Sequence, residues 1–195
     1  MNERTLVKVT NVGVFCGSSN NVDPKYLRSA AELGEAIVAN GWTTIYGGGG
    51  CGLMGALAYA VLGAGGEIIG VRPGHISDIE ADQAGLTELI MTTTMHERIA
   101  ILFDRSDAFV ILPGSCGTLD ELMEAVTWKR LALHNKAIVI LNQDGYFDPL
   151  LAMFERIVDE RFVSPAFLEL YTVCRDVPEI IEQLKTHRPV ALEPL

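Results

Sequence analysis

Residues 108–118 read AFVILPGSCGT and indicate how this chain folds. Five apolar residues come first, and a strand without polar side chains is typical of a parallel sheet that is covered on both faces. A proline-glycine turn follows, and an amphipathic helix is expected from about Thr118, with Leu119 and Leu122 on its sheet-facing side. The stretch therefore predicts a buried strand, a tight turn and a helix.

The same alternation continues along the whole chain. Strands are expected at residues 11–16, 43–46, 67–71, 86–91, 108–112, 137–141 and 171–174, and helices from about residues 24, 53, 95, 118, 149 and 178. This order predicts an α/β, Rossmann-like, doubly wound and mainly parallel sheet with helices on both faces. We see no linker or repeat, so residues 1–195 are expected to form a single domain. Ligands are expected at the carboxyl ends of the strands.

Composition excludes several classes of protein. With 49% hydrophobic and 21% charged residues, the chain is not intrinsically disordered. Its 15 basic and 25 acidic residues give a net charge of −10, which argues against nucleic acid or an anionic membrane as a partner. No apolar run reaches the roughly 18 residues that a membrane span needs.

The cysteines and histidines predict neither a disulfide frame nor a metal site. Cys16, Cys51, Cys116 and Cys174 are far apart, and His96 and His134 have no partners at metal-ligand spacing. Widely spaced cysteines are typical of reduced thiols, so we expect a cytoplasmic protein that binds no metal and no cofactor.

A glycine-rich loop, GGGGCGLMG, spans residues 47–55. Because glycine loses the most backbone entropy on folding, such a run indicates close approach of the backbone to a ligand or positive φ angles. One interpretation is a loop whose amides bind phosphate at a helix N-terminus, with Gly48 and Gly49 as contacts. A tight strand-to-helix turn is the structural alternative. A dinucleotide site is disfavoured because the next strand ends in Arg72 and not in an acid, although an arginine suits the extra phosphate of NADP.

The loop at residues 113–121 predicts a second anion site, formed by a glycine turn and a helix N-terminus. Glu121 is expected in the first helical turn, where the helix dipole favours its ionised form. A carboxylate beside an anion site suits a reaction that develops positive charge. The alternative is that Thr118 and Glu121 form a capping box and only satisfy helix amides.

Arg98 is expected near the start of a helix, within the sequence MHERI. A surface salt bridge is the structural alternative to a functional role. No nucleophile elbow or Ser-His-Asp order supports acyl transfer.

Taken together, these motifs resemble the LONELY GUY (LOG) family of phosphoribohydrolases. That family has the pattern P-G-G-x-G-T-x-x-E, preceded by M-H-x-R-K and by a G-G-G-x-x-G-L-M-G loop. The segment VFCGSS at residues 14–19 is similar as well, and the resemblance covers about residues 11–186. Many members carry the label "lysine decarboxylase", but the chain has no motif for a lysine that binds pyridoxal phosphate.

The resemblance implies hydrolysis of the N-glycosidic bond of a purine nucleoside 5′-monophosphate, either a cytokinin ribotide or AMP. It implies a homodimer or a larger assembly, and it places the catalytic residues at Arg98 and Glu121. The substrate-binding residues that we expect from the motifs and the resemblance are Gly17, Ser18, Gly48, Gly49, Glu80, Gly114, Ser115, Cys116, Gly117, Thr118 and Thr127.

The chain departs from the family pattern at two positions. Ser115 replaces the second glycine of P-G-G, and Ile99 replaces the lysine after the arginine. A serine that needs positive φ costs on the order of 1 kcal/mol, whereas at negative φ its hydroxyl could donate to phosphate. A non-catalytic nucleotide or molybdenum-cofactor carrier of the same fold is the alternative function, and retention of both Arg98 and Glu121 favours the enzyme.

Overall fold

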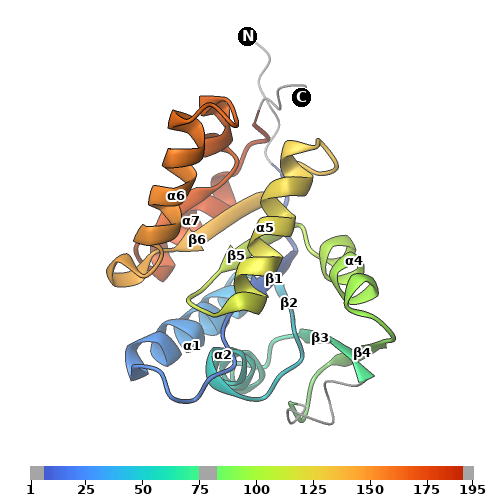
Figure 1. The fold of residues 1–195 in the computed structure, drawn as a ribbon. Coiled ribbons are helices and arrows are strands. Elements are labelled where there is room, and N and C mark those ends of the chain that lie inside the picture. Colours follow the sequence, from blue (N-terminus) through green and yellow to red (C-terminus); the bar gives the residue numbers. More distant parts are fainter. Residues whose placement is uncertain (1–6, 75–82, 191–195) are drawn as a thin grey trace.

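A parallel seven-stranded sheet forms the centre of the molecule (Figure 1). The computed structural model describes residues 7–74 and 83–190. Within them, the strands follow the order β4-β3-β2-β1-β5-β6-β7. Their bounds are β1 Asn11–Phe15, β2 Thr43–Tyr46, β3 Ile68–Pro73, β4 Glu88–Thr92, β5 Ala108–Ile111, β6 Ala137–Leu141 and β7 Thr172–Cys174.

The strand order creates one switch point in the middle of the sheet. From β1 the chain builds outward through β2 and β3 to β4, and it then crosses back to place β5 on the other side of β1. Val12 of β1 pairs with Thr44 on one side and with Ala108 on the other. Because the connections after β1 and β5 leave in opposite directions, a crevice is expected between their carboxyl ends.

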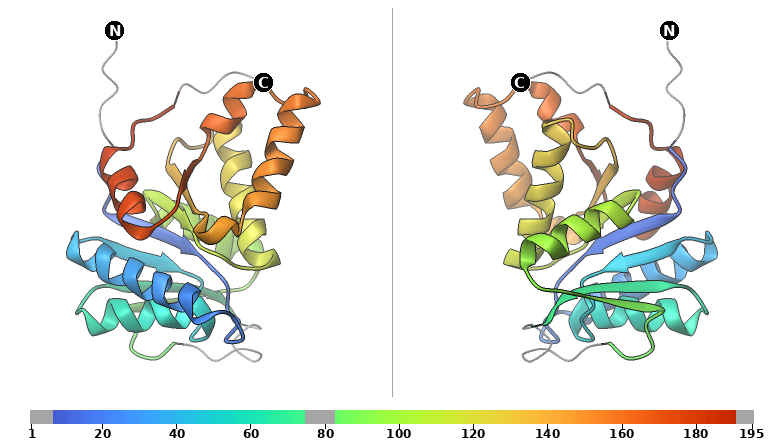
Figure 2. Two further views of the ribbon diagram at one scale, coloured as in Figure 1. Left: turned by 90° about the vertical axis from the view of Figure 1, so that its left-hand side faces the viewer. Right: turned by 90° about the vertical axis from the view of Figure 1, so that its right-hand side faces the viewer.

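Helices cover both faces of the sheet, as the two views in Figure 2 show. One layer contains α1 (Pro24–Ala39), α2 (Gly52–Gly63) and α7 (Val177–Thr186). The other contains α4 (Met95–Arg105), α5 (Cys116–Arg130) and α6 (Asp148–Asp159). Each layer buries its own apolar cluster against the sheet, which confirms the α/β, Rossmann-like fold.

The local sequence explains where most of these elements begin. All residues of β5 are buried, as its apolar sequence predicts. Asp23 caps α1 by accepting a hydrogen bond from the Lys25 amide, and Pro24 occupies the first helical position. Predicted and observed bounds agree within one or two residues for most elements. Two short 3₁₀ helices, Gln143–Gly145 and Pro165–Glu169, were not expected.

Within the described ranges, no helix has both the length and the apolar character needed to cross a bilayer.

Candidate active site

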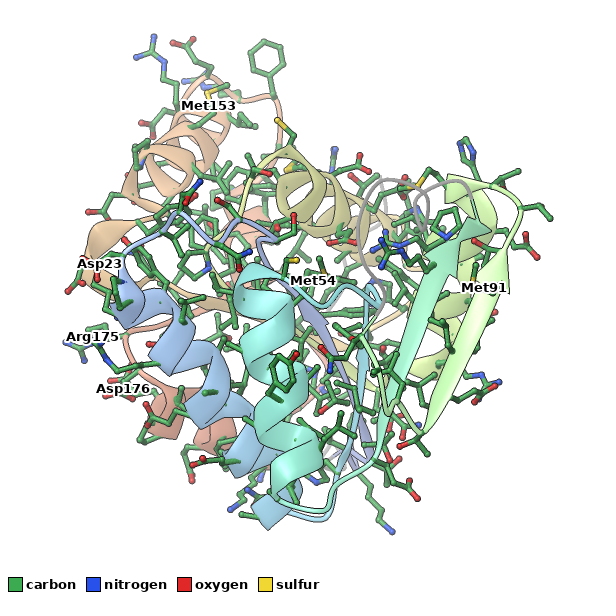
Figure 3. The ribbon with its side chains drawn as sticks, turned by 90° about the horizontal axis from the view of Figure 1, so that it is seen from below. Asp23, Met54, Met91, Met153, Arg175 and Asp176 are labelled. Carbon is green, nitrogen blue, oxygen red and sulfur yellow. The ribbon has the colours of Figure 1, made fainter. Side chains whose placement is uncertain are left out.

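A cavity of about 180 Å³ opens at the carboxyl edge of the sheet, beside the switch point. Its wall comes from the ends of β1, β2 and β3 and from the first turns of α2, α4 and α5. The lining residues are Val14, Phe15, Cys16, Gly17, Ser18, Gly47, Met54, Arg72, Pro73, Met95, Arg98, Ser115, Gly117, Thr118 and Glu121. In Figure 3, which looks at the molecule from below, Met54 marks the start of α2 beside this edge. The helix starts and strand ends that the sequence singled out therefore meet at one cavity.

Arg98 and Glu121 form an ion pair in this cavity. The guanidinium Nη2 of Arg98 lies 2.8 Å from Glu121 Oε1, and the two side chains are only 12% and 8% exposed. Arg98 also donates from Nε to the carbonyl of Val71, at the end of β3. The interpretation of Arg98 as a residue of a surface salt bridge is therefore wrong. Its ion pair with Glu121 is buried and links α4 to α5.

The start of α4 is held by side chains of its own segment. Thr94 caps the helix by accepting from the Glu97 amide, and Glu97 accepts in return from the amide and hydroxyl of Thr93. These bonds satisfy amides at the helix start that have no intrahelical acceptor. Arg98 therefore projects from a fixed first turn.

Glu121 lies in a different place on its helix from the one predicted. Helix α5 begins at Cys116, two residues before the expected start, so Glu121 lies in the second turn and the dipole argument for its ionisation is wrong. The capping box is wrong too, because Thr118 is already inside the helix and Ser115 is its N-cap.

Burial and Arg98 act in opposite directions on the Glu121 carboxyl. Burial is the larger effect and raises the pKa of Glu121, while the charge and hydrogen bond of Arg98 lower it. A raised carboxyl pKa lies closer to neutral pH, where a general base works best. The pair therefore supplies a carboxylate that is poised to accept a proton.

Gly47 leaves room for the Arg98 side chain. A Cβ atom at Gly47 would lie 2.8 Å from Arg98 Nη2 and 3.1 Å from the Met54 sulfur. A side chain at this first glycine of the glycine-rich loop would therefore displace the guanidinium or the Met54 side chain, a reason for glycine that the sequence alone did not reveal.

The amides at the start of α2 are used within the protein. Gly52 donates to the side-chain oxygen of Asn20, and Leu53 and Met54 both donate to the carbonyl of Gly17. Gly48 has a φ of +80° and, like Gly49, is buried outside the lining of the cavity. This arrangement favours the turn interpretation of the loop over a first anion site.

The start of α5 has the features expected of an anion site. Its first three amides have no intrahelical acceptor, and no residue in the described part of the chain accepts from them. A Cβ atom at Gly117 would meet nothing within 4 Å, so protein packing does not require this glycine, which lines the open cavity. Backbone amides and the helix dipole therefore point at free space.

Ser115 fits this loop without strain. Its φ is −103°, and its side chain makes no capping hydrogen bond. Because φ is negative, the penalty considered for serine at this position does not arise. The hydroxyl lies at the wall of the cavity and has a proton to donate.

For the purine nucleoside 5′-monophosphate that the family resemblance implies as substrate, we expect Ser115→Gly to change the KM only several-fold. The anion site is built from backbone amides, which either residue provides, and the hydroxyl adds at most one donor. Steady-state kinetics of the two proteins checks this expectation. A rise in kcat/KM of a hundredfold or more, about 2.7 kcal/mol, would show instead that the serine disables the site.

A second cavity of about 230 Å³ lies on the α1 side of the same crevice. It shares Gly17, Ser18 and Ser115 with the first cavity. Tyr26 and Tyr146 line it with rings packed edge to face at 5.7 Å, and Tyr146 donates to the carbonyl of Gly114. The loop after β1 and the loop at the start of α5 thus form the wall between the two cavities.

Not all of the predicted site residues line the cavities. Cys116 is exposed at the start of α5, and Thr127 is exposed further along the same helix and lines neither cavity. Glu80 lies outside the described residues. Ile99 is buried in the apolar cluster beneath α4, so it leaves no cation in the place of the family's lysine.

Several lining residues were not predicted from the sequence, namely Met54, Arg72, Met95 and Tyr146. For Arg72 the sequence contained a signal, because a charged residue at the end of an apolar strand points to the ligand edge of the sheet. Tyr146 lies in the segment NQDGYF at residues 142–147, which resembles a segment of the LOG family, but no role at the site was predicted for it.

Cys16 is not suited to act as a nucleophile, and no metal cluster is found among the described residues. Burial, assisted by the charge of Glu121, raises the pKa of the Cys16 thiol and keeps it protonated. Across residues 7–74 and 83–190, no three His, Cys, Asp or Glu side chains gather as metal ligands would. Among the described lining residues, Arg98 and Glu121 form the ion pair that faces the cavity.

The fold is shared with molybdenum-cofactor proteins of known structure. The molybdenum cofactor carrier protein MCP from Chlamydomonas reinhardtii superimposes with a TM-score of 0.68 at 26% identity, covering 91% of this chain and 98% of its own. A molybdenum cofactor binding protein from Rippkaea orientalis gives a TM-score of 0.70 at 22% identity, with 91% and 96% covered, which shows the fold alone.

Sequence comparison gives a stronger likeness. A family model described as "Possible lysine decarboxylase" matches residues 54–184. A probable cytokinin riboside 5′-monophosphate phosphoribohydrolase of Oryza sativa subsp. japonica is 41% identical over 92% of this chain and 79% of its own length. The cytokinin riboside 5′-monophosphate phosphoribohydrolase of Rhodococcoides fascians is 41% identical over 90% of this chain and 89% of its own. Likeness at this level over nine-tenths of the sequence shows that the chain belongs to the LOG family of phosphoribohydrolases.

Proposed function

We propose that this protein hydrolyses the N-glycosidic bond of purine nucleoside 5′-monophosphates and releases the free base and ribose 5-phosphate. The observation that carries the proposal is the buried Arg98–Glu121 pair, which faces a cavity whose rim is the start of α5. The names of the relatives support the same reaction. AMP and cytokinin ribotides are the substrates that we propose.

The proposed reaction breaks the bond between C1′ and N9, and the bonding electrons leave with the base. Positive charge then develops on the ribose, and the ionised Glu121 stabilises that charge at close range. Water adds its oxygen to C1′ and gives a proton to Glu121, and the departing base takes up a proton in turn. Arg98 holds the carboxylate by its 2.8 Å contact and keeps it aimed at the cavity.

The 5′-phosphate is assigned to the start of α5. Free amides at Cys116, Gly117 and Thr118 and the dipole of a 15-residue helix favour an anion there. Binding energy from a phosphate that does not react can orient the ribose at Glu121. Because the chain carries a net charge of −10, the substrate must be attracted by this local arrangement and not by the overall charge.

AMP is expected to be cleaved with a kcat/KM at least a hundredfold above that of adenosine, because adenosine lacks the group that binds α5. The measurement is chromatography for adenine after incubation of the protein with each compound. Equal kcat/KM values would refute the role assigned to α5. Tight binding of AMP without any release of adenine would favour the carrier function, for which the fold of MCP is a precedent.

We also propose that the protein forms a homodimer through α5 and α6. Met123, Thr127 and Leu131 follow one another at four-residue spacing along α5, so they lie on one exposed face. Leu133, just after the helix, is 67% exposed, and Met153 lies on the outward side of α6 (Figure 3). An apolar face of this kind is typical of obligate dimers. On this model, Thr127 lies in the interface.

Sedimentation equilibrium at micromolar concentration is expected to give about twice the chain mass of 21.2 kDa. A charged residue on this apolar face should weaken association, so Leu131→Asp is expected to shift the mass toward that of one chain. A wild-type protein that sediments as a monomer would contradict the proposal.

We infer a cytoplasmic location from the thiols. All four cysteines are free, which suits a reducing compartment.

A further inference from the structure

The side chain of Tyr146 holds the loop that leads into α5. Its hydroxyl donates to the carbonyl of Gly114 at 2.7 Å, although the two residues are 32 positions apart in the chain. Tyr146 lines the second cavity and is not among the residues that line the first, where Arg98 and Glu121 lie. The hydroxyl therefore contacts the backbone of the candidate anion site from the side opposite the ion pair.

The hydrogen bond from Tyr146 sets the direction of the next backbone amide. The peptide unit that joins Gly114 to Ser115 is planar and trans, so its carbonyl and its N–H point in opposite directions. Because the carbonyl points toward Tyr146, the N–H of Ser115 points away from it. Within residues 7–74 and 83–190 no acceptor is found for this N–H, and Ser115 also lines the first cavity. The Ser115 amide is thus a fourth donor beside the three free amides of α5.

Gly114 makes this peptide dependent on an outside contact. A Cβ atom at Gly114 would collide with the Thr118 side chain and lie 2.8 Å from the Gly17 nitrogen, so packing requires a glycine here. Glycine, however, lets the peptides on both of its sides rotate easily. The preceding peptide is fixed because the Pro113 carbonyl accepts from the Gly17 amide at 3.1 Å. For the following peptide, the corresponding contact is the Tyr146 hydroxyl.

Tyr146 is itself held in place by α1. Its ring packs edge to face against Tyr26 of that helix, with 5.7 Å between the ring centroids. Three residues before Tyr146, the side-chain oxygen of Gln143 accepts from the hydroxyl of Ser29, also in α1, at 2.8 Å. Two contacts with one helix therefore fix the segment and the position of the tyrosine hydroxyl.

On the basis of the proposed function, we propose that Tyr146 is a positioning residue for the 5′-phosphate. Its hydroxyl keeps the peptide between Gly114 and Ser115 turned so that the Ser115 amide joins the amides of α5 in binding the phosphate. Tyr146 does not touch the substrate and acts through the backbone alone. Because the phosphate does not react, it is bound equally in the ground state and the transition state, so this contribution belongs to KM and not to kcat.

The experiment removes one oxygen atom from the protein and measures which ligands are affected. Tyr146→Phe deletes the hydroxyl and keeps the ring that packs against Tyr26. Tyr59→Phe is the matched control, because Tyr59 is 66% exposed on α2 and lines neither cavity. Steady-state kinetics with AMP gives KM and kcat. Calorimetry gives the Kd of ribose 5-phosphate, which carries the phosphate, and of adenine, which does not.

Tyr146→Phe is expected to raise the KM for AMP about tenfold and to leave kcat within about twofold of the wild type. The Kd of ribose 5-phosphate is expected to rise by a similar factor, about tenfold, since the same hydrogen bond to the phosphate is weakened. The Kd of adenine should not change. Tyr59→Phe should alter none of these values.

A KM and a Kd of ribose 5-phosphate that match the wild type would overturn the proposal, because the peptide would then keep its direction without Tyr146. Equal losses of affinity for ribose 5-phosphate and adenine, or a lower kcat with an unchanged KM, would overturn it too, since they indicate a general disturbance of the site. A wild-type protein that binds ribose 5-phosphate but releases no adenine from AMP would refute the proposed function. The two Kd values would still decide the role of Tyr146.

Discussion

Glu121→Gln is expected to lower the release of adenine from AMP about a thousandfold, with the fold intact. Glutamine has nearly the shape of glutamate, and its carbonyl oxygen can still accept from Arg98, but it carries no charge and cannot take a proton from water. Loss of a general base costs 10²–10⁴-fold in general, and loss of an electrostatic stabiliser adds to this. Steady-state kinetics with chromatography for adenine measures the effect.

The same variant is expected to be at least as stable as the wild type at neutral pH. Burial raises the pKa of Glu121 in the folded protein, so folding is favoured with the carboxyl protonated and disfavoured once the pH rises through that pKa. Glutamine resembles the protonated form and avoids this cost. Thermal unfolding at pH 7 should therefore show no lower Tm for Glu121→Gln.

Glu124→Gln is the matched control, since Glu124 lies three residues further along α5 and does not line the cavity. It should retain wild-type turnover. Near-normal turnover in Glu121→Gln would refute the catalytic assignment.

Arg98→Met is expected to reduce kcat/KM for AMP about a hundredfold at pH 7 and to shift the acid limb of the pH profile upward. Arg98 lowers the pKa of Glu121, so its removal lets burial raise that pKa further. Glu121 is then protonated at pH values at which the wild type is ionised, and activity falls at a higher pH.

The pH dependence of kcat/KM tests this mechanism, because a merely structural defect would lower the whole profile without moving its limb. Arg98→Lys keeps a cation near Glu121 and should shift the limb less than Arg98→Met. An acid limb at the wild-type position in Arg98→Met would show that Arg98 does not tune Glu121.

Local patterns in the sequence predicted much of the fold. The apolar run of β5 and the periodicity of α4 need no information from elsewhere in the chain, and both elements were predicted within one residue. The start of α5 was harder, because its N-cap Ser115 makes no capping hydrogen bond that would fix the first turn.

The parts of the site that could not be predicted depend on contacts between distant segments. Two glycine loops looked equivalent in sequence, but Asn20 and Gly17 take up the amides of α2, whereas those of α5 face the cavity. Likewise, the spacing of Thr118 and Glu121 predicted a capping box. In the structure, Arg98 of α4 lies within 2.8 Å of Glu121 and is its partner. Spacing along a chain does not show which acceptor will lie opposite a given donor.

The shared wall between the two cavities has a consequence for inhibitor design. Gly17, Ser18 and Ser115 line both, so small compounds bound on the two sides would be separated by little more than the loop after β1 and the loop at the start of α5. A short tether between an anionic fragment and an aromatic fragment that packs against Tyr26 and Tyr146 would make the second binding event intramolecular. Effective concentrations for short linkers are in the millimolar range, so two weak fragments could be joined into one compound with an affinity that neither reaches alone.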